Sequence, residues 1–113
     1  MTAYSRGDVV LVNFVFADET GVKQRPAVIV SSDVYHNGRD EIIIEAITSR
    51  TDRVLVGDHP IKNWQGAGLL FPSVATGIIR TVKQDMITHK LGSMPSPDMK
   101  AIDSKMRLAL GLS

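Results

Sequence analysis

The sequence predicts a mainly β protein: a small, curled antiparallel barrel with one C-terminal α-helix. Three observations predict this class. Short runs rich in Val and Ile alternate with polar segments that contain Gly or Pro, as in proteins built from short strands. Aromatic residues make up only 5% of the chain, so the core must be built from Val, Ile and Leu. The last part of the chain changes to helical spacing.

The strand signals occupy most of the chain, whose 113 residues suit one domain spanning residues 1–113. The run "DVVLVNF" (8–14) follows the turn residue Gly7. The run "PAVIVS" (26–31) begins with Pro26, which cannot donate a ladder hydrogen bond and suits a strand's first position. The run "IIIEAI" (42–47) is continuous enough to be buried on both faces. Further strands are expected within "VLVGDHPIKN" and near residues 73–82 and 87–93.

A helix is expected over residues 97–111. Ser96 provides an N-cap, Pro97 suits the first helical position, and Gly111 can end the helix. The apolar residues that fall at helical spacing are Met99, Ile102, Met106 and Ala109 or Leu110.

Composition excludes several classes. Thirteen basic and twelve acidic residues give a formal charge of +1, which argues against a strongly basic nucleic-acid coat protein but permits a local basic groove. There is no cysteine, so disulfide scaffolds and thiolate zinc sites are excluded. The polar start lacks a secretory h-region and no run has the length of a membrane helix, so a soluble cytoplasmic protein is expected.

Familiar catalytic motifs are missing. The sequence has no P-loop, no GxGxxG after a strand, no HExxH and no nucleophile elbow. His36, His59 and His89 lie in different predicted segments, so we expect surface or turn histidines rather than a metal site or an acid–base pair. No metal and no cofactor is predicted.

The ends of two predicted core strands remain as candidates for chemistry. Arg25 opens the second strand and Thr48 closes the third. If these strands are neighbours, a guanidinium and a hydroxyl share one rim, and such a pair suits a phosphate. The residues alone leave the alternative open that Arg25 pairs with a carboxylate such as Asp33 and that Thr48 merely ends a strand.

Six motifs follow one another along the chain: "YSRGDVVLVNF", "KQRPAVIVSSDVY", "EAITSR", "GIIRTV", "KLGSM" and "MRLALGLS". In this order they resemble the MazF/PemK family, the toxins of bacterial toxin–antitoxin pairs, and the resemblance covers residues 4–112. It implies an SH3-like barrel that forms a homodimer, cleaves single-stranded RNA and is blocked by a cognate antitoxin protein.

The resemblance also implies the catalytic residues. The arginine before the proline corresponds to Arg25, and the threonine of "ITS" corresponds to Thr48. The implied reaction is metal-free attack of the ribose 2′-OH on its own phosphate, which leaves a 2′,3′-cyclic phosphate and a 5′-OH. A guanidinium stays protonated in water, so Arg25 suits charge stabilisation and protonation of the leaving oxygen better than base catalysis, with Thr48 orienting the phosphate.

Residues in the two flanking polar loops are candidates for RNA binding. An aromatic ring can stack a base, and cations or hydroxyls can contact phosphates and base edges. For each candidate, a solvated loop residue is the alternative. The candidates are Phe16, Lys23, Ser49 and Arg50.

The chain departs from one part of the family pattern. PemK-type relatives carry an arginine and an aspartate shortly before the "RTI" strand, whereas Ala75 and Gly77 stand at those places here. The sequence therefore favours the pair Arg25 and Thr48 over the PemK-type set.

Three other functions compete with the enzyme. A family member without activity would bind only RNA or a partner protein. A gyrase-poisoning CcdB-like toxin would need a C-terminal "WGI"-type ending, but this chain ends in "ALGLS". An SH3-like peptide-binding module would need more aromatic residues than three Phe, two Tyr and one Trp.

Overall fold

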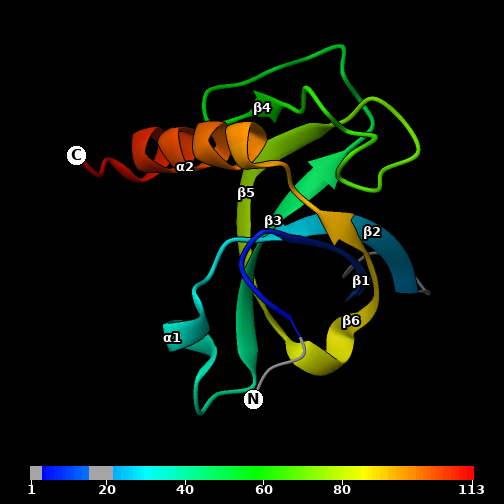
Figure 1. Cartoon of the computed structure of the whole chain (residues 1–113), viewed down its shortest axis with the longest axis vertical. Coiled ribbons are helices and arrows are strands. Elements are labelled where there is room, and N and C mark those ends of the chain that lie inside the picture. Colours follow the sequence, from blue (N-terminus) through cyan, green and yellow to red (C-terminus); the bar gives the residue numbers. More distant parts are fainter. Residues whose placement is uncertain (1–3, 16–21) are drawn as a thin grey trace.

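The computed structural model describes residues 4–15 and 22–113. Six antiparallel strands form one strongly curled sheet in the order β4-β5-β3-β2-β1-β6, and helix α2 lies across one end of it (Figure 1). The prediction of a mainly β antiparallel fold with a C-terminal helix is confirmed. In the part of the chain described, β4 and β6 are the two edges, so the curled sheet is not closed by hydrogen bonds into a complete barrel. The elements are β1 (Asp8–Val15), β2 (Val22–Ile29), α1 (Asp33–His36), β3 (Glu41–Thr48), β4 (His59–Pro60), β5 (Val74–Lys83), the 3-10 helix η1 (Gln84–Met86), β6 (Ile87–Ser93) and α2 (Ser96–Leu110).

One predicted strand region is almost entirely a loop. The run "VLVGDHPIKN" contributes only β4, two residues long, while Val56 before it is 80% exposed. Gly57 has φ of 97°, in the left-handed region, which interrupts an extended chain. Asp58 then folds the segment back, because its carboxylate accepts the N–H of Leu55 at 2.9 Å. Apolar composition alone therefore predicted too much strand here.

Two of the three histidines are buried, which contradicts the prediction of surface or turn positions for them. His36 ends the short helix α1, and its Nε2 lies 2.5 Å from Oγ of the buried Ser31. His59 lies in β4, and its Nε2 lies 2.8 Å from Oδ1 of the buried Asp98. Both rings reach these positions because a neighbouring polar side chain provides a hydrogen bond inside the fold.

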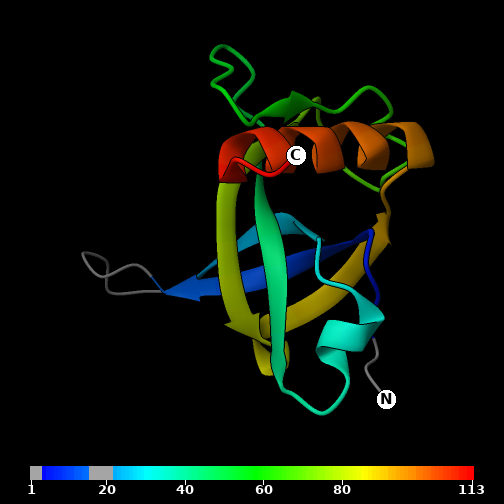
Figure 2. The same cartoon turned by 90° about the vertical axis from the view of Figure 1, so that its left-hand side faces the viewer.

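The C-terminal helix is confirmed, with a different start. Pro95 occupies the N-cap position without a side-chain hydrogen bond, and Ser96, predicted as the N-cap, is already helical. Gly111 ends the helix as predicted, with φ of 71° and its N–H directed at two carbonyls of the last turn. Ile102 is fully buried, whereas Leu108 and Leu110 in the last turn of α2 are exposed. Figure 2 shows α2 lying across the end of the curled sheet.

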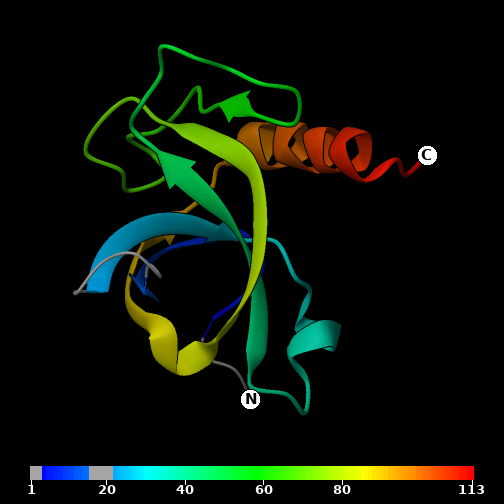
Figure 3. The same ribbon diagram turned by 180° about the vertical axis from the view of Figure 1, so that it is seen from behind.

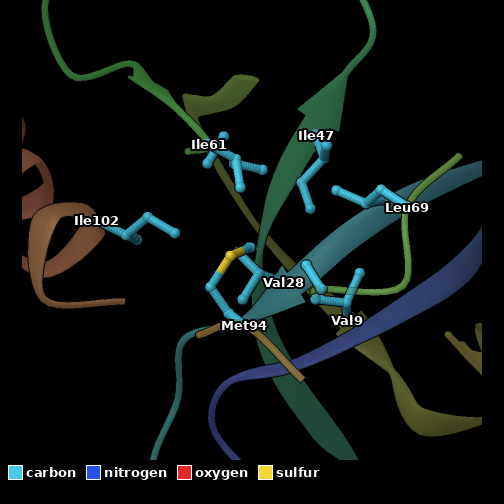
Figure 4. Packing of buried hydrophobic residues seen from close by; sticks show 9 residues of the cluster. Val9, Val28, Ile47, Ile61, Leu69, Met94 and Ile102 are labelled. Carbon is cyan, nitrogen blue, oxygen red and sulfur yellow. The ribbon is translucent and has the colours of Figure 1, made fainter. Parts of the chain in front are cut away.

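The buried apolar side chains form two clusters on the two faces of the curled sheet. The outer cluster lies between the sheet, the segment around β4 and α2, and Ile102 points into it from the helix (Figure 4). The inner cluster fills the curl and includes Val12, Phe14 and Ile44. Because β3 has buried residues on both faces, its continuous apolar run is explained.

Asp98 fastens the start of α2 to the segment that follows β4. Its Oδ1 accepts the N–H of Lys62 at 2.8 Å, its Oδ2 accepts the N–H of Asn63 at 3.0 Å, and His59 is the third partner. Burial alone would raise the pKa of this carboxyl, but the hydrogen bonds from His59 and the two backbone groups outweigh burial, and the pKa is lowered. The ionised carboxylate is therefore the form that holds helix and loop together.

Replacement of Asp98 by asparagine should lower the free energy of unfolding by about 2 kcal/mol at pH 7, because charge-assisted hydrogen bonds in a buried site are weakened. The stability that the wild-type carboxylate contributes is present above its unfolded pKa and is lost as the pH falls through the lower folded value. Urea unfolding of both proteins at pH 7 and at pH 3 measures this. An equal difference at the two pH values would contradict the assignment.

Candidate active site

A cleft begins where strands β2 and β3 stop pairing. Their ladder runs only as far as the pair Ala27 and Ala46. Arg25 and Thr48 each lie two residues beyond that pair on their own strands, so both are on the same face as the paired alanines and opposite each other. The structure thus brings together the arginine and the hydroxyl that the sequence analysis placed at two strand ends.

An irregularity in β5 widens the same region. Between the pairs that join Ile47 to Ala75 and Glu45 to Ile79, three residues of β5 face one residue of β3. Thr76 fixes this bulge by donating its hydroxyl to the carbonyl of Ala46 at 2.7 Å. Ala75 and Gly77, the positions that depart from the PemK-type pattern, lie within this irregular stretch of β5.

The cleft has a volume of about 680 Å³ and is amphipathic. Most of its lining residues are apolar, and two of them, Leu70 and Phe71, are largely exposed. The segment that carries them lies on the opposite side of the molecule from α1 (Figure 3). The described lining includes two guanidinium groups and no carboxylate, so the cleft attracts anions. Polar residues at the cleft are Arg25, Thr48, Ser49, Ser73, Thr76 and Arg80.

Arg25 is exposed at the cleft and makes no ion pair with any residue that the structure describes. The alternative of a structural pair with Asp33 is not observed. Asp33 lies in α1, is 75% exposed and has its Oδ1 3.9 Å from Nδ1 of His36. The guanidinium of Arg25 is thus available to a ligand.

Thr48 is the last residue of β3 and is half-buried. Its Oγ1 accepts the N–H of Arg50 at 3.1 Å, which fixes the hydroxyl oxygen in place. A hydroxyl can accept and donate at the same time, so its own hydrogen remains for a ligand in the cleft. This geometry suits hydrogen bonding to a phosphate oxygen or a ribose hydroxyl.

The four candidates for RNA binding differ in their placement. Ser49 lines the cleft. The Nε of Arg50 lies instead 3.0 Å from Oδ1 of Asp52, and this hydrogen bond lowers the pKa of the Asp52 carboxyl. Lys23 is exposed and is not among the residues lining the cleft, and Phe16 lies outside the described residues. Their contacts with RNA remain predictions.

Arg80 is a cleft residue that the sequence analysis did not select. Its Cζ lies 5.1 Å from the centroid of the Phe14 ring, which belongs to the inner cluster. The motif "GIIRTV" could have indicated it, because Arg80 is two residues from both Ile78 and Val82 and so shares one face of the strand with these apolar residues.

Glu45 is the second group that was missed. It lies in the middle of β3 and is 0% exposed, and neither carboxylate oxygen has a hydrogen-bond partner among the described residues. Burial, together with the charges of Asp58 and Asp103, raises its pKa from 4.5 to about 8. Glu45 does not line the cleft, so we assign its effect to stability.

In the part of the chain that the structure describes, no three His, Asp or Glu side chains are grouped so that they could hold a metal ion. No helix in that part of the chain has the length and apolar character needed to cross a membrane.

Comparison with known proteins identifies the family. The model of the PemK-like, MazF-like toxins of type II toxin–antitoxin systems matches residues 5–110, so the chain belongs to this family. The resemblance seen in the sequence is thereby confirmed, and the class of protein is a toxin of a toxin–antitoxin pair.

Solved structures share the fold across nearly the whole chain. An endoribonuclease in complex with its cognate antitoxin, from a mycobacterial species, is 22% identical with a TM-score of 0.78, and the match covers 98% of both chains. A MazE–MazF structure from Deinococcus radiodurans is 19% identical with a TM-score of 0.80, covering 99% of this chain and 100% of the other. The Mycobacterium tuberculosis toxin MazF-mt6 is 20% identical with a TM-score of 0.76, covering 94% and 98%.

Proposed function

We propose that this toxin is an endoribonuclease that cleaves single-stranded RNA selectively at short sequences and without a metal ion. The observation that carries the proposal is the cleft in which Arg25 and Thr48 face each other across the end of the β2–β3 ladder. Membership of the toxin family and the fold shared with structures described as endoribonucleases support it.

The chemistry needs little from the protein. The 2′-oxygen of the ribose forms a bond to phosphorus while the bond to the 5′-oxygen breaks, so the nucleophile comes with the substrate. The products are a 2′,3′-cyclic phosphate and a 5′-hydroxyl, and one proton leaves the 2′-oxygen while another reaches the 5′-oxygen. The protein must align these atoms and stabilise negative charge on the phosphate oxygens.

Arg25 fits charge stabilisation. It presents several donors in a fixed fork to an anionic oxygen pair and can also protonate the leaving 5′-oxygen. Carboxylate ligands for a divalent cation are missing from the described lining of the cleft, which supports a reaction that uses a guanidinium in place of a metal.

Thr48 orients the phosphate or the 2′-hydroxyl through its free hydrogen. Replacement by valine keeps the shape and removes the hydroxyl, so we expect the cleavage rate to fall about 10- to 100-fold with little change in stability. Replacement by serine is the matched control and should keep most of the activity. Cleavage of a long single-stranded RNA, followed on a denaturing gel, measures both variants, and full activity of the valine variant would contradict this role.

The proposal includes the partners and the location. Unrestrained RNA cleavage stops growth, so a cognate antitoxin should occupy the cleft when the toxin is silent, and the toxin should act as a homodimer in the cytoplasm. The structures of related toxins in complex with antitoxins support the first point. The alternative is a family member that binds RNA or a partner protein without cutting. A folded wild-type protein that binds but leaves several varied RNAs intact would favour that alternative.

A further inference from the structure

Arg80 contributes a second guanidinium to the cleft, reached from a different strand. It lies on β5 beside Ile44 of β3, while Arg25 lies on β2 beside Val12 of β1. The curl of the sheet brings β5 round to β1, so that the guanidinium of Arg80 meets the ring of Phe14. Both arginines therefore flank one opening, although they are 55 positions apart in the sequence.

The ring of Phe14 holds the Arg80 side chain in place. This ring is 4% exposed and belongs to the inner cluster, so it forms a rigid support for the cation. Two residues further along β5, Val82 is buried in the same cluster, which fixes the face on which Arg80 lies. A guanidinium stacked on an aromatic face keeps its N–H edges free for other partners.

The charge of Arg80 is not compensated within the described part of the chain. It makes no ion pair there, and no carboxylate lines the cleft. Two uncompensated cations in one opening are unusual for a protein with a formal net charge of only +1. Their repulsion would be relieved by a polyanion that places a phosphate at each.

Arg80 and the pair formed by Arg25 and Thr48 lie at different heights along β3. Thr48 is four residues from Ile44, the neighbour of Arg80, which corresponds to about 13 Å at the usual rise of a strand. The scissile phosphate lies at Thr48 and Arg25 in the proposed function. The backbone of Arg80 is therefore displaced along the strand from the scissile phosphate, which favours a neighbouring phosphate as its ligand.

We propose that Arg80 is a phosphate-binding residue that holds a phosphate neighbouring the scissile one and so sets the register of the RNA in the cleft. The inference rests on the proposed ribonuclease function. It assigns Arg80 to binding and Arg25 to the chemical step. Loss of Arg80 should therefore raise KM, whereas loss of Arg25 should lower kcat.

Binding is tested with a short fluorescein-labelled RNA in which every ribose is 2′-O-methylated, so that no nucleophile is present. Fluorescence anisotropy at several NaCl concentrations gives the slope of log K against log[salt]. For Arg80→Gln we expect about tenfold weaker binding at low salt and a slope smaller by about 0.7, the value for one phosphate contact of a single strand. Arg80→Lys keeps the charge and should restore the slope.

Arg39→Gln is the matched control. It removes one positive charge at a guanidinium that lies 4.3 Å over the ring of Tyr35 in α1, and Arg39 is not among the residues that line the cleft. This control should leave both affinity and slope unchanged. Thermal unfolding of all variants confirms that they are folded.

Cleavage of unmodified RNA completes the test. We expect Arg80→Gln to raise KM about tenfold with kcat within about threefold of wild type. An unchanged salt slope, or a loss confined to kcat, would overturn the assignment of Arg80. A wild-type protein that binds the methylated RNA but cuts no unmodified RNA would refute the proposed ribonuclease function. In that case the salt slopes of the variants would still decide whether Arg80 binds a phosphate. A wild-type protein that does not bind would overturn both.

Discussion

Replacement of Arg25 by alanine should lower the rate of RNA cleavage by at least about 100-fold, since removal of one donor aimed at a developing oxyanion typically has this effect. In the structure this guanidinium is exposed at the cleft, opposite Thr48, and no described carboxylate neutralises it. Because the side chain is exposed, the variant should remain folded. Single-turnover cleavage with saturating enzyme isolates the chemical step from binding.

Two further variants sharpen this prediction. Arg25→Lys keeps the charge but loses the planar fork, so its rate should remain at least about tenfold below that of wild type. Near-normal cleavage by the lysine variant would show that fork geometry is irrelevant and that the role assigned to Arg25 is wrong. Arg39→Ala, which removes an arginine outside the cleft, should cleave like the wild type.

Replacement of Glu45 by leucine should stabilise the protein, and the gain should grow with pH. In the wild type the buried carboxyl binds a proton that the unfolded chain releases near pH 4.5, since its folded pKa is raised to about 8 by burial and by Asp58 and Asp103. The contribution of neutral Glu45 to the free energy of unfolding is therefore fully present below pH 4.5 and is lost as the pH rises to about 8. Each pKa unit corresponds to about 1.4 kcal/mol, so the total loss approaches about 5 kcal/mol.

The physical reason lies in the packing of β3 under α2. Glu45 is on the same face of β3 as Ile47, whose cluster includes Ile102 of the helix. Asp103, which pairs with Arg6, and Asp58 are both acidic, so ionised Glu45 would meet repulsion and no hydrogen bond. Leucine fills a similar volume without a charge.

Urea unfolding at pH 4.5, 6, 7.5 and 9 measures the effect as the difference between Glu45→Leu and wild type, which cancels the titration of other groups. Glu41→Gln is the control, because Glu41 begins the same strand but is only half-buried. Its effect on the free energy of unfolding at pH 9 should be much smaller than that of Glu45→Leu. A Glu45→Leu difference that is the same at pH 4.5 and pH 9 would show that Glu45 is not held as a neutral acid.

Most of the fold could be predicted from the sequence, because its signals are local. Runs of β-branched residues gave five of the six strands, and Gly111 marked the end of α2. The prediction of a strand around Val56 was wrong because an apolar run forms a strand only if a neighbouring strand pairs with it. Gly57 and Asp58 turn the chain here, so Val56 has no such neighbour. Whether β4 and β6 pair and close the barrel depends on strands that are distant in the sequence, so no local pattern predicts that the sheet stays open there.

The site could be predicted only in part. Arg25 and Thr48 were found because each stands in a family motif, and the register of β2 and β3 then places them opposite each other. Thr48 does end β3, but the prediction that Arg25 opens its strand was wrong, because β2 already pairs with β1 from Val22 onward and Arg25 and Pro26 lie inside it. Arg80 and Glu45 were missed because each is one charged residue inside an apolar run. Whether such a residue faces a cleft or the core depends on the curl of the sheet and on the bulge in β5, which sequence spacing does not reveal.

The central claim, a metal-independent ribonuclease in which Arg25 acts on the scissile phosphate, is tested most directly by the ends of its products. Purified toxin, freed of antitoxin, is incubated in EDTA with a long single-stranded RNA, beside Arg25→Ala, and the fragment ends are mapped. We expect discrete cuts with 2′,3′-cyclic phosphate and 5′-hydroxyl ends that disappear in the variant. Fragments with 5′-phosphate ends, cleavage that stops in EDTA, or equal cutting by Arg25→Ala would contradict the account.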